Sequence, residues 1–237
     1  MALINPFQST AVFVLETFCD QLWGFKPNLI RPLVRQKGAV RLLFWFIPNM
    51  LKYEGILERW GPIRTHLLAV HLCAINGCRY CVFGHAYALE LTYLKLTGQL
   101  FPLTEHQLMN LCGQNEADIL TTLQHALTEA NLNGEILTLQ RLGELYHRPE
   151  LATTQSDHQL THLIRLFATL NACGIKSNLQ TDQAHDPINK NRAMRDRYKA
   201  LRQSQQSTPA NTQPTGVTIL NPADISAEPI NLSTGFL

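Results

Sequence analysis

Apolar side chains recur every three to four residues along most of this chain, which is the period of an amphipathic α-helix. Runs that alternate Val, Ile or Thr with polar residues, as half-buried strands do, are absent before residues 217–220. With 237 residues, of which 45% are hydrophobic and 16% charged, the chain can build one sizeable core. The pattern therefore predicts an all-α protein with one multi-helical domain and short appendages.

Ten helices are predicted from this period, and four of them start at recognisable signals, one of which is the Gly61–Pro62 pair before the predicted helix 62–75. Residues 104–107 and 156–159 fit a capping box, in which a Thr or Ser side chain accepts a hydrogen bond from the backbone and a Gln reaches back. Asp186 precedes a proline, which is a favourable helix start because proline needs no partner for a backbone N–H. The predicted helices span residues 9–23, 33–46, 49–60, 62–75, 79–97, 104–112, 116–131, 134–146, 157–172 and 187–202.

The six cysteines are too sparse for the disulfide framework of a small secreted protein, so we expect reduced thiols in the cytoplasm. Residues 1–25 carry no Lys or Arg, and two acidic residues interrupt their apolar run, which is unlike a signal peptide. The longest apolar stretch, residues 39–51, falls short of the roughly 20 residues that a membrane span needs. We expect a soluble protein with no membrane partner, with a helix lying against a membrane as the alternative for this stretch.

Charge and composition divide the chain into N-terminal helices (1–60), a helical core (61–187), a basic helix (188–202) and an extended arm (203–237). The formal net charge is −1 over residues 1–187, +5 over the basic helix and −2 over the arm. Because most of the chain is nearly neutral, nucleic acid is a poor partner. We expect the basic helix to be solvated or to face a neighbouring subunit. The arm is rich in Pro, Ser, Thr and Gln, so we expect it to lie over its own or a neighbouring subunit.

Three reactive residues, Cys78, Cys81 and His85, form a C-x-x-C-x-x-x-H pattern. At about 100° per residue they share one face of a helix. Cys81 and His85 are then separated by roughly 40° around the helix axis, and Cys78 and His85 by roughly 20°. One imidazole can therefore serve either sulfur.

Asn76 and Gly77 predict the end of the preceding helix, which places Cys78 at the start of the next one. The free N–H groups and the positive dipole end of that helix stabilise a thiolate, so we expect the pKa of Cys78 to be lowered from about 8.5. A thiolate attacks the O–O bond of a peroxide and becomes a sulfenic acid, which a second thiol converts to a disulfide. The pair can also exchange disulfides with a protein or a small thiol. His85 would act as general base and proton donor in either reaction.

A zinc site is the structural alternative for the same three residues. It would need a fourth ligand, for which Cys73, His71 and His66 are the candidates. Their spacing does not match a known zinc finger, and we therefore favour redox chemistry without a bound metal or cofactor.

Residues 77–85, GCRYCVFGH, resemble the signature of the carboxymuconolactone decarboxylase and alkyl hydroperoxidase D family, and the match extends over residues 62–90. The decarboxylases of that family lack the cysteine pair, so the pair indicates the hydroperoxidase branch. The resemblance implies a multi-helical fold around a helix start that bears the C-x-x-C motif, and assembly into homotrimers or homohexamers. It also implies that Cys81 reacts with the peroxide, that Cys78 is the resolving thiol and that His85 belongs to a proton relay.

The chain departs from the family pattern twelve residues before the first cysteine. The family has a relay glutamate there, whereas this chain has His66, which can relay protons but is not permanently anionic. Glu58 and Glu90 are candidates for the missing carboxylate. Tyr80 stands where some members have a second histidine. Its hydroxyl is expected to bond to the site, or its ring to anchor the helix start.

We therefore expect a thiol-dependent peroxidase or disulfide oxidoreductase with an antioxidant role, which acts on a hydroperoxide and is reset by a thiol or protein reductant. Six aromatic residues would form core, a subunit interface or a channel for a bulky hydroperoxide: Trp23, Phe25, Phe44, Trp45, Phe46 and Trp60. Two alternatives stay open: a helical oligomeric scaffold with a relic or zinc-filled site, and an acid–base enzyme that resembles the decarboxylases.

Overall fold

A computed structural model describes residues 6–207, and every regular element in that range is helical, which confirms the all-α prediction. The part of the arm beyond residue 207 lies outside the described residues. Within them, no helix combines the length and the apolar character needed to cross a bilayer. The helices are α1 (Pro6–Trp23), α2 (Ile30–Lys37), α3 (Ala39–Trp60), α4 (Pro62–Ile75), α5 (Arg79–Thr97), α6 (Glu105–Met109), α7 (Glu116–Glu129), α8 (Ile136–His147), α9 (Gln155–Lys176) and α10 (Arg192–Ser207), with short 3-10 turns η1 (Asn133–Glu135), η2 (Pro149–Leu151) and η3 (Pro187–Lys190).

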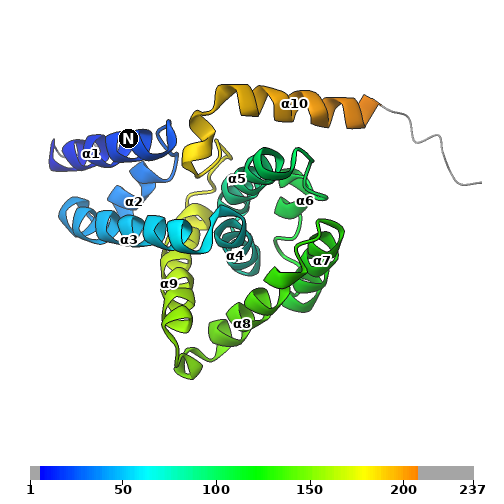
Figure 1. Cartoon of the computed structure of the whole chain (residues 1–237). Helices are drawn as coiled ribbons and strands as arrows, with labels where there is room; N and C mark the ends of the chain where they lie inside the picture. Colours follow the sequence, from blue (N-terminus) through cyan, green and yellow to red (C-terminus); the bar gives the residue numbers. More distant parts are fainter. Residues whose placement is uncertain (1–5, 208–237) are drawn as a thin grey trace, which may run out of the picture.

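The antiparallel pair α4 and α5 lies in the middle of the molecule (Figure 1). Helices α1 to α3 and α9 surround it on one side, α6 to α8 on the other, and α10 lies against α5 at one edge (Figure 1). Every residue of α4 from Thr65 to Ala74 is buried. From Tyr80 to Leu94, every residue of α5 except Phe83 is buried. Helices that are apolar all round belong in a core, and this burial places the C-x-x-C motif inside the protein.

The turn between α4 and α5 follows the sequence prediction. Gly77 adopts a left-handed conformation with φ +77°, which a residue with a side chain rarely takes. The Cys78 N–H then donates to the Cys73 carbonyl over 2.9 Å, and α5 begins at the next residue. The predicted helices 62–75 and 79–97 agree with the structure at both ends.

The prediction for residues 30–60 was wrong about where the helix breaks. The break falls at Gly38, where φ is +82°, and α3 continues through Pro48. Pro48 lacks the N–H that would bond to the carbonyl of Phe44, but Phe44 is 80% exposed, so water can bond to that carbonyl instead. The proline is therefore tolerated inside the helix.

The capping box predicted at residues 156–159 was also wrong, whereas the one at residues 104–107 is confirmed. Helix α9 begins earlier, because the Thr154 hydroxyl accepts from the Asp157 N–H and the Asp157 carboxylate accepts from the Thr154 N–H, each over 3.1 Å. Arg141 binds the same carboxylate and holds it in place. The predicted helix 187–202 is in fact divided into η3 and α10.

The basic helix, predicted to be solvated or to face a neighbouring subunit, buries one face against α5. Tyr198 is 3% exposed and donates a hydrogen bond to the Glu90 carboxylate over 2.6 Å. Arg202 forms an ion pair with the same carboxylate, and Tyr198 also bonds to Glu105. Burial and the neighbouring Glu105 raise the pKa of Glu90, and Arg202 opposes that shift. Arg202 therefore provides the cation that makes a buried carboxylate tolerable.

Replacement of Arg202 by Met should lower the free energy of unfolding by about 3–5 kcal/mol, because it leaves the Glu90 carboxylate buried without its cation. Urea denaturation measures this loss. The matched control is Arg192→Met, since Arg192 is exposed in the same helix and its loss should change stability by less than about 0.5 kcal/mol. Equal stability of the two variants would contradict a stabilising role for the Arg202 contact.

Candidate active site

The two cysteines of the motif lie with their sulfurs 3.0 Å apart, on the first turn of α5. Cys78 is the N-cap residue of that helix, and Cys81 follows one turn later. Gly174 of α9 faces the pair: a β-carbon there would lie 2.9 Å from the Cys78 sulfur. This glycine therefore leaves space for the sulfur atoms. Both cysteines are free thiols, and their separation is short enough for a disulfide to form after a small movement.

The expectation of a lowered Cys78 pKa was wrong. The hydrogen bond from its thiol to Cys81 and its burial together raise the pKa of Cys78, and they outweigh the stabilisation by backbone N–H groups at the helix start. Burial, followed by a hydrogen bond with Cys73, also raises the pKa of Cys81 well above its ordinary value. Both sulfurs are therefore protonated near neutral pH, and either needs a base to become a nucleophile.

His85 is the candidate base, and it is connected to two further residues. Its Nδ1 lies 3.3 Å from Nδ1 of His66, and Nε2 of His66 lies 2.9 Å from a carboxylate oxygen of Asp186. Among the described residues, Nε2 of His85 has no hydrogen-bond partner, and it is therefore available to a thiol or a ligand. Burial, followed by the neighbouring His185 and His66, lowers the pKa of His85 well below its ordinary value. His85 is thus neutral and able to accept a proton near pH 7.

The carboxylate of this relay is Asp186, and neither candidate from the sequence supplies it. Glu58 is exposed, and Glu90 is bound to α10. Burial opposes ionisation of Asp186, but the hydrogen bond and the charge of His66 outweigh it and lower the pKa of Asp186. The sequence marked Asp186 only as a helix cap, and its carboxylate does cap η3 by accepting from the Ile188 N–H over 2.7 Å. Its second role depends on packing between distant segments.

Tyr80 belongs to a second polar group beside the cysteines. Its hydroxyl donates to Asp182 over 2.7 Å, and the other oxygen of Asp182 lies 3.1 Å from Nε2 of His185. The hydrogen bond from His185 overcomes the effect of burial and lowers the pKa of Asp182. The ring of His185 packs against those of Trp23 and Phe25, with centroids 5.7 and 5.9 Å away. Tyr80 thus fixes the segment that carries His185 against the helix start.

Asp182 and His185 were not among the site residues expected from the sequence, although one signal for them exists. Gly84 lies inside α5, where glycine destabilises a helix by roughly 1 kcal/mol relative to alanine. A β-carbon at Gly84 would lie 2.4 Å from Nδ1 of His185, and the Gly84 carbonyl accepts from the His185 N–H over 3.1 Å. A glycine inside a buried helix therefore marks the close approach of another segment.

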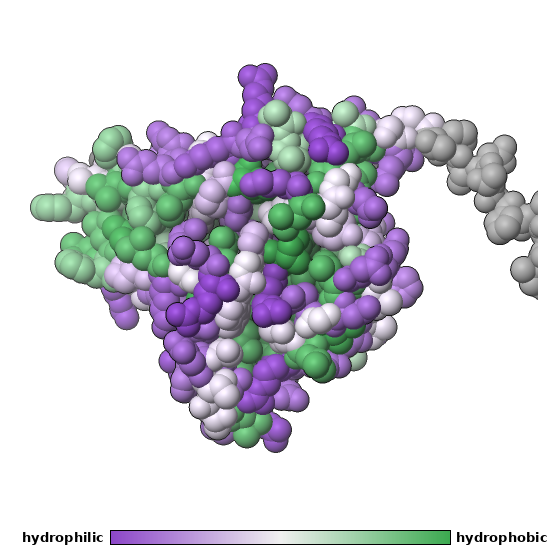
Figure 2. All heavy atoms as spheres, viewed as in Figure 1, coloured by the Kyte–Doolittle hydropathy of each residue, from purple (hydrophilic) through white to green (hydrophobic). Residues whose placement is uncertain are grey.

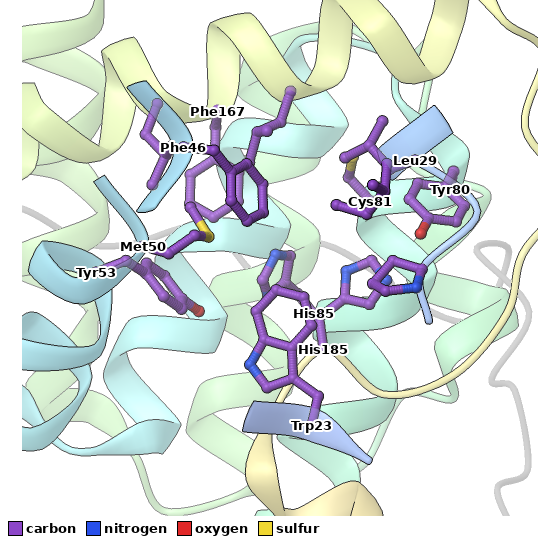
Figure 3. Close-up of a pocket in the computed structure, with 14 residues that line it drawn as sticks. Trp23, Leu29, Phe46, Met50, Tyr53, Tyr80, Cys81, His85, Phe167 and His185 are labelled. Atoms are coloured by element: carbon purple, nitrogen blue, oxygen red, sulfur yellow. The ribbon is translucent and has the colours of Figure 1, made fainter. Parts of the chain in front are cut away.

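An apolar cavity of about 30 Å³ adjoins Cys81 and His85 (Figure 3). Cys81 and Tyr80 lie at one side of it and Tyr53 at the other, with His85 and His185 between them (Figure 3). Trp23 and Phe46 belong to the aromatic set that the sequence associated with a possible channel. The cavity is lined by Trp23, Pro27, Leu29, Ile30, Phe46, Met50, Tyr53, Tyr80, Cys81, His85, Leu166, Phe167, Leu170 and His185.

A second cavity, of about 250 Å³, reaches Cys78 from a different direction. Its walls come from the turn before α5, the end of α9 and the segment after it, including Arg79, Asn178 and Gln180. The two cysteines therefore contact different spaces: Cys81 the small apolar cavity, and Cys78 the wider and more polar one.

Of the residues considered as a fourth zinc ligand, Cys73 and His66 lie next to the site. Cys73 lies beside Cys81 and donates a hydrogen bond to Asn171 over 3.3 Å, and His66 is engaged by Asp186. His71 is buried without a hydrogen-bond partner for either ring nitrogen in the described part of the chain. Within residues 6–207, no three His, Cys, Asp or Glu side chains are arranged to hold a metal ion.

All five residues singled out from the sequence lie around this one site: Cys78, Cys81, His85, His66 and Tyr80. No protein-family model matches the chain, and neither does any curated protein or solved structure.

Proposed function

We propose that this protein is a thiol-dependent peroxidase of the alkyl hydroperoxidase D type, with Cys81 as the nucleophile, Cys78 as the resolving thiol and His85 as the proton shuttle. The observation that carries the proposal is the sulfur pair, 3.0 Å apart, with one sulfur in the same cavity as a buried neutral imidazole. The His66–Asp186 pair takes the place of the family's relay glutamate.

In the first step, Nε2 of His85 accepts the proton of the Cys81 thiol. The sulfur then attacks the terminal oxygen of the hydroperoxide, the one that carries the hydrogen. The O–O bond breaks, the sulfur is oxidised by two electrons to a sulfenic acid, and His85 returns the proton to the departing alkoxide, which leaves as an alcohol. His66 and the Asp186 carboxylate orient the imidazole and stabilise it while it carries the proton.

In the second step, the Cys78 thiol attacks the sulfenic sulfur of Cys81, a disulfide forms and water leaves. An external dithiol then reduces the disulfide by exchange. The wider cavity at Cys78 supports its role as the sulfur that meets this reductant.

Exposed apolar side chains on α1 and α3 support the proposal that the protein forms homotrimers or homohexamers. Phe13, Val40, Phe44 and Leu51 are each more than half exposed. Figure 2 shows an apolar area on the side of the molecule where α1 and α3 lie. Apolar areas of this kind are typical of subunit contacts.

A thiol titration tests the proposed function. Reduced protein treated with one equivalent of tert-butyl hydroperoxide should lose two of its six thiols, and dithiothreitol should restore both. The matched control is the Cys78→Ser/Cys81→Ser double variant, which should lose no thiols under the same treatment and over the same time. Stoichiometric zinc in the purified protein, with no loss of thiols, would instead support the scaffold with a zinc-filled site.

A further inference from the structure

The small cavity contains a hydroxyl group that the proposed mechanism does not use. Tyr53 of α3 lines the cavity and is 2% exposed. Its ring contacts those of His85 and Phe167, with centroids 6.1 and 6.0 Å away. Its hydroxyl has no hydrogen-bond partner among the described residues. Figure 3 shows this hydroxyl directed to the side of the cavity where His85 and Trp23 lie.

An unpaired buried hydroxyl is costly, because it gives up its bonds to water and gains none in return. Two of the neighbouring polar groups are already engaged, and the free Nε2 of His85 makes no hydrogen bond to this hydroxyl. Tyr80 is bound to Asp182, and the indole N–H of Trp23 donates to Glu54 over 3.3 Å. Phenylalanine would fill the same volume without this cost. Folding stability therefore does not explain the hydroxyl, whereas a hydrogen bond to a bound ligand does.

The chemical state of Tyr53 suits it to donate a hydrogen bond. Burial, followed by the negative charges of Glu54 and Asp186, raises the pKa of Tyr53 well above its ordinary value. The phenol is therefore neutral, with its proton in place, throughout the pH range in which the protein works. A neutral O–H in an apolar cavity binds an oxygen atom without introducing a charge.

We propose that Tyr53 donates a hydrogen bond to the oxygen of a small apolar ligand in this cavity, namely an alkyl hydroperoxide before the reaction and its alcohol afterwards. This inference rests on the proposed function for the identity of the hydroperoxide. His85 and Cys81 border the same cavity, so a ligand held there by its oxygen lies beside the proposed nucleophile and base.

The size of the cavity limits the class of ligand. A water molecule needs roughly 10–15 Å³ of such volume, so about 30 Å³ is space for two or three groups of that size, which favours a small alkyl group over a bulky one. The apolar walls favour an alkyl group over a second polar end. We therefore expect tert-butyl hydroperoxide to react faster than the bulkier cumene hydroperoxide and faster than hydrogen peroxide.

The Tyr53→Phe variant tests the inference in two ways. The rate constant for tert-butyl hydroperoxide should fall about tenfold, whereas the rate at which the Cys78–Cys81 disulfide is reduced by dithiothreitol should not change. The redox-inert product tert-butanol, followed by saturation-transfer NMR on the reduced protein, should bind about tenfold more weakly. The melting temperature should stay the same or rise by about 2–4 °C, because an unpaired hydroxyl is lost.

The matched control is Tyr93→Phe. Tyr93 is also buried in the core, but its hydroxyl donates to the Ala130 carbonyl over 3.2 Å, away from the cavity. Its loss should lower the melting temperature by about 4 °C and leave both rates and tert-butanol binding unchanged. Equal binding of tert-butanol by wild type and Tyr53→Phe, or no binding by wild type, would overturn the inference. If only the reaction with peroxide is absent, the proposed function fails and the binding site stands.

Discussion

Replacement of Cys81 by Ser should abolish the proposed consumption of hydroperoxide, with a loss of at least about 10³-fold in the second-order rate constant. A serine hydroxyl is isosteric with the thiol but is not oxidised by a peroxide, so no sulfenic acid forms. The surroundings cannot replace the lost sulfur, because Cys78 contacts the other, more polar cavity and not the one that holds His85. Stopped-flow mixing of reduced protein with tert-butyl hydroperoxide measures the effect.

The Cys78→Ser variant should behave differently and thereby separate the two sulfurs. Its first reaction with peroxide should keep a rate within about tenfold of wild type, because the nucleophile and the base are intact. Turnover with dithiothreitol should fall much further, because the sulfenic acid lacks its resolving thiol. Cys112→Ser, half-buried and outside both cavities, is the matched control and should react as wild type does. A fast first reaction in Cys81→Ser with none in Cys78→Ser would reverse the two roles.

The sequence predicted the central helices well because local signals define both of their ends. Pro62 begins α4, Gly77 closes the turn after it, and Gly98 ends α5 in a left-handed conformation with φ +75°. The same reasoning failed near Pro48, because the effect of a proline depends on whether the carbonyl it leaves unpaired reaches water. That depends on tertiary burial, which the local sequence does not contain.

The residues of the candidate site also fall into those that local sequence brings together and those that only tertiary packing does. Cys78, Cys81 and His85 lie within three turns of one helix, so the helical period alone brings them together. Asp186 lies about 100 residues after His85 in the sequence and Tyr53 about 30 residues before it, and only the packing of α3, α5 and η3 around the cavity brings them together. No spacing in the chain encodes such a contact. The burial of a polar side chain without a partner becomes visible only in three dimensions.

The rate of the reaction with peroxide should be almost independent of pH between about 6.5 and 9, and should fall at lower pH. Burial and the neighbouring histidines lower the pKa of His85 well below 6.5. The imidazole is therefore neutral at pH 6.5 and above, and it can no longer accept a proton once a lower pH protonates it. The pKa of Cys81 is raised well above 9 by burial, so spontaneous ionisation of the thiol adds little below pH 9. Stopped-flow rates from pH 4.5 to 9 measure the profile.

Removal of the base should change both the size of this rate and its pH dependence. His85→Gln should lower the rate by about 10²- to 10⁴-fold, and the remaining rate should rise about tenfold per pH unit, since only the free thiolate can then react. Asp186→Asn should cost about 10- to 100-fold, because the amide can still cap η3 at the Ile188 N–H but gives His66 no negative charge. Equal melting temperatures for wild type and Asp186→Asn would assign that loss to the proton relay. A wild-type rate that rises tenfold per pH unit between pH 7 and 9 would contradict base catalysis by His85. When a neutral imidazole removes the thiol proton, the rate does not depend on the fraction of free thiolate in solution.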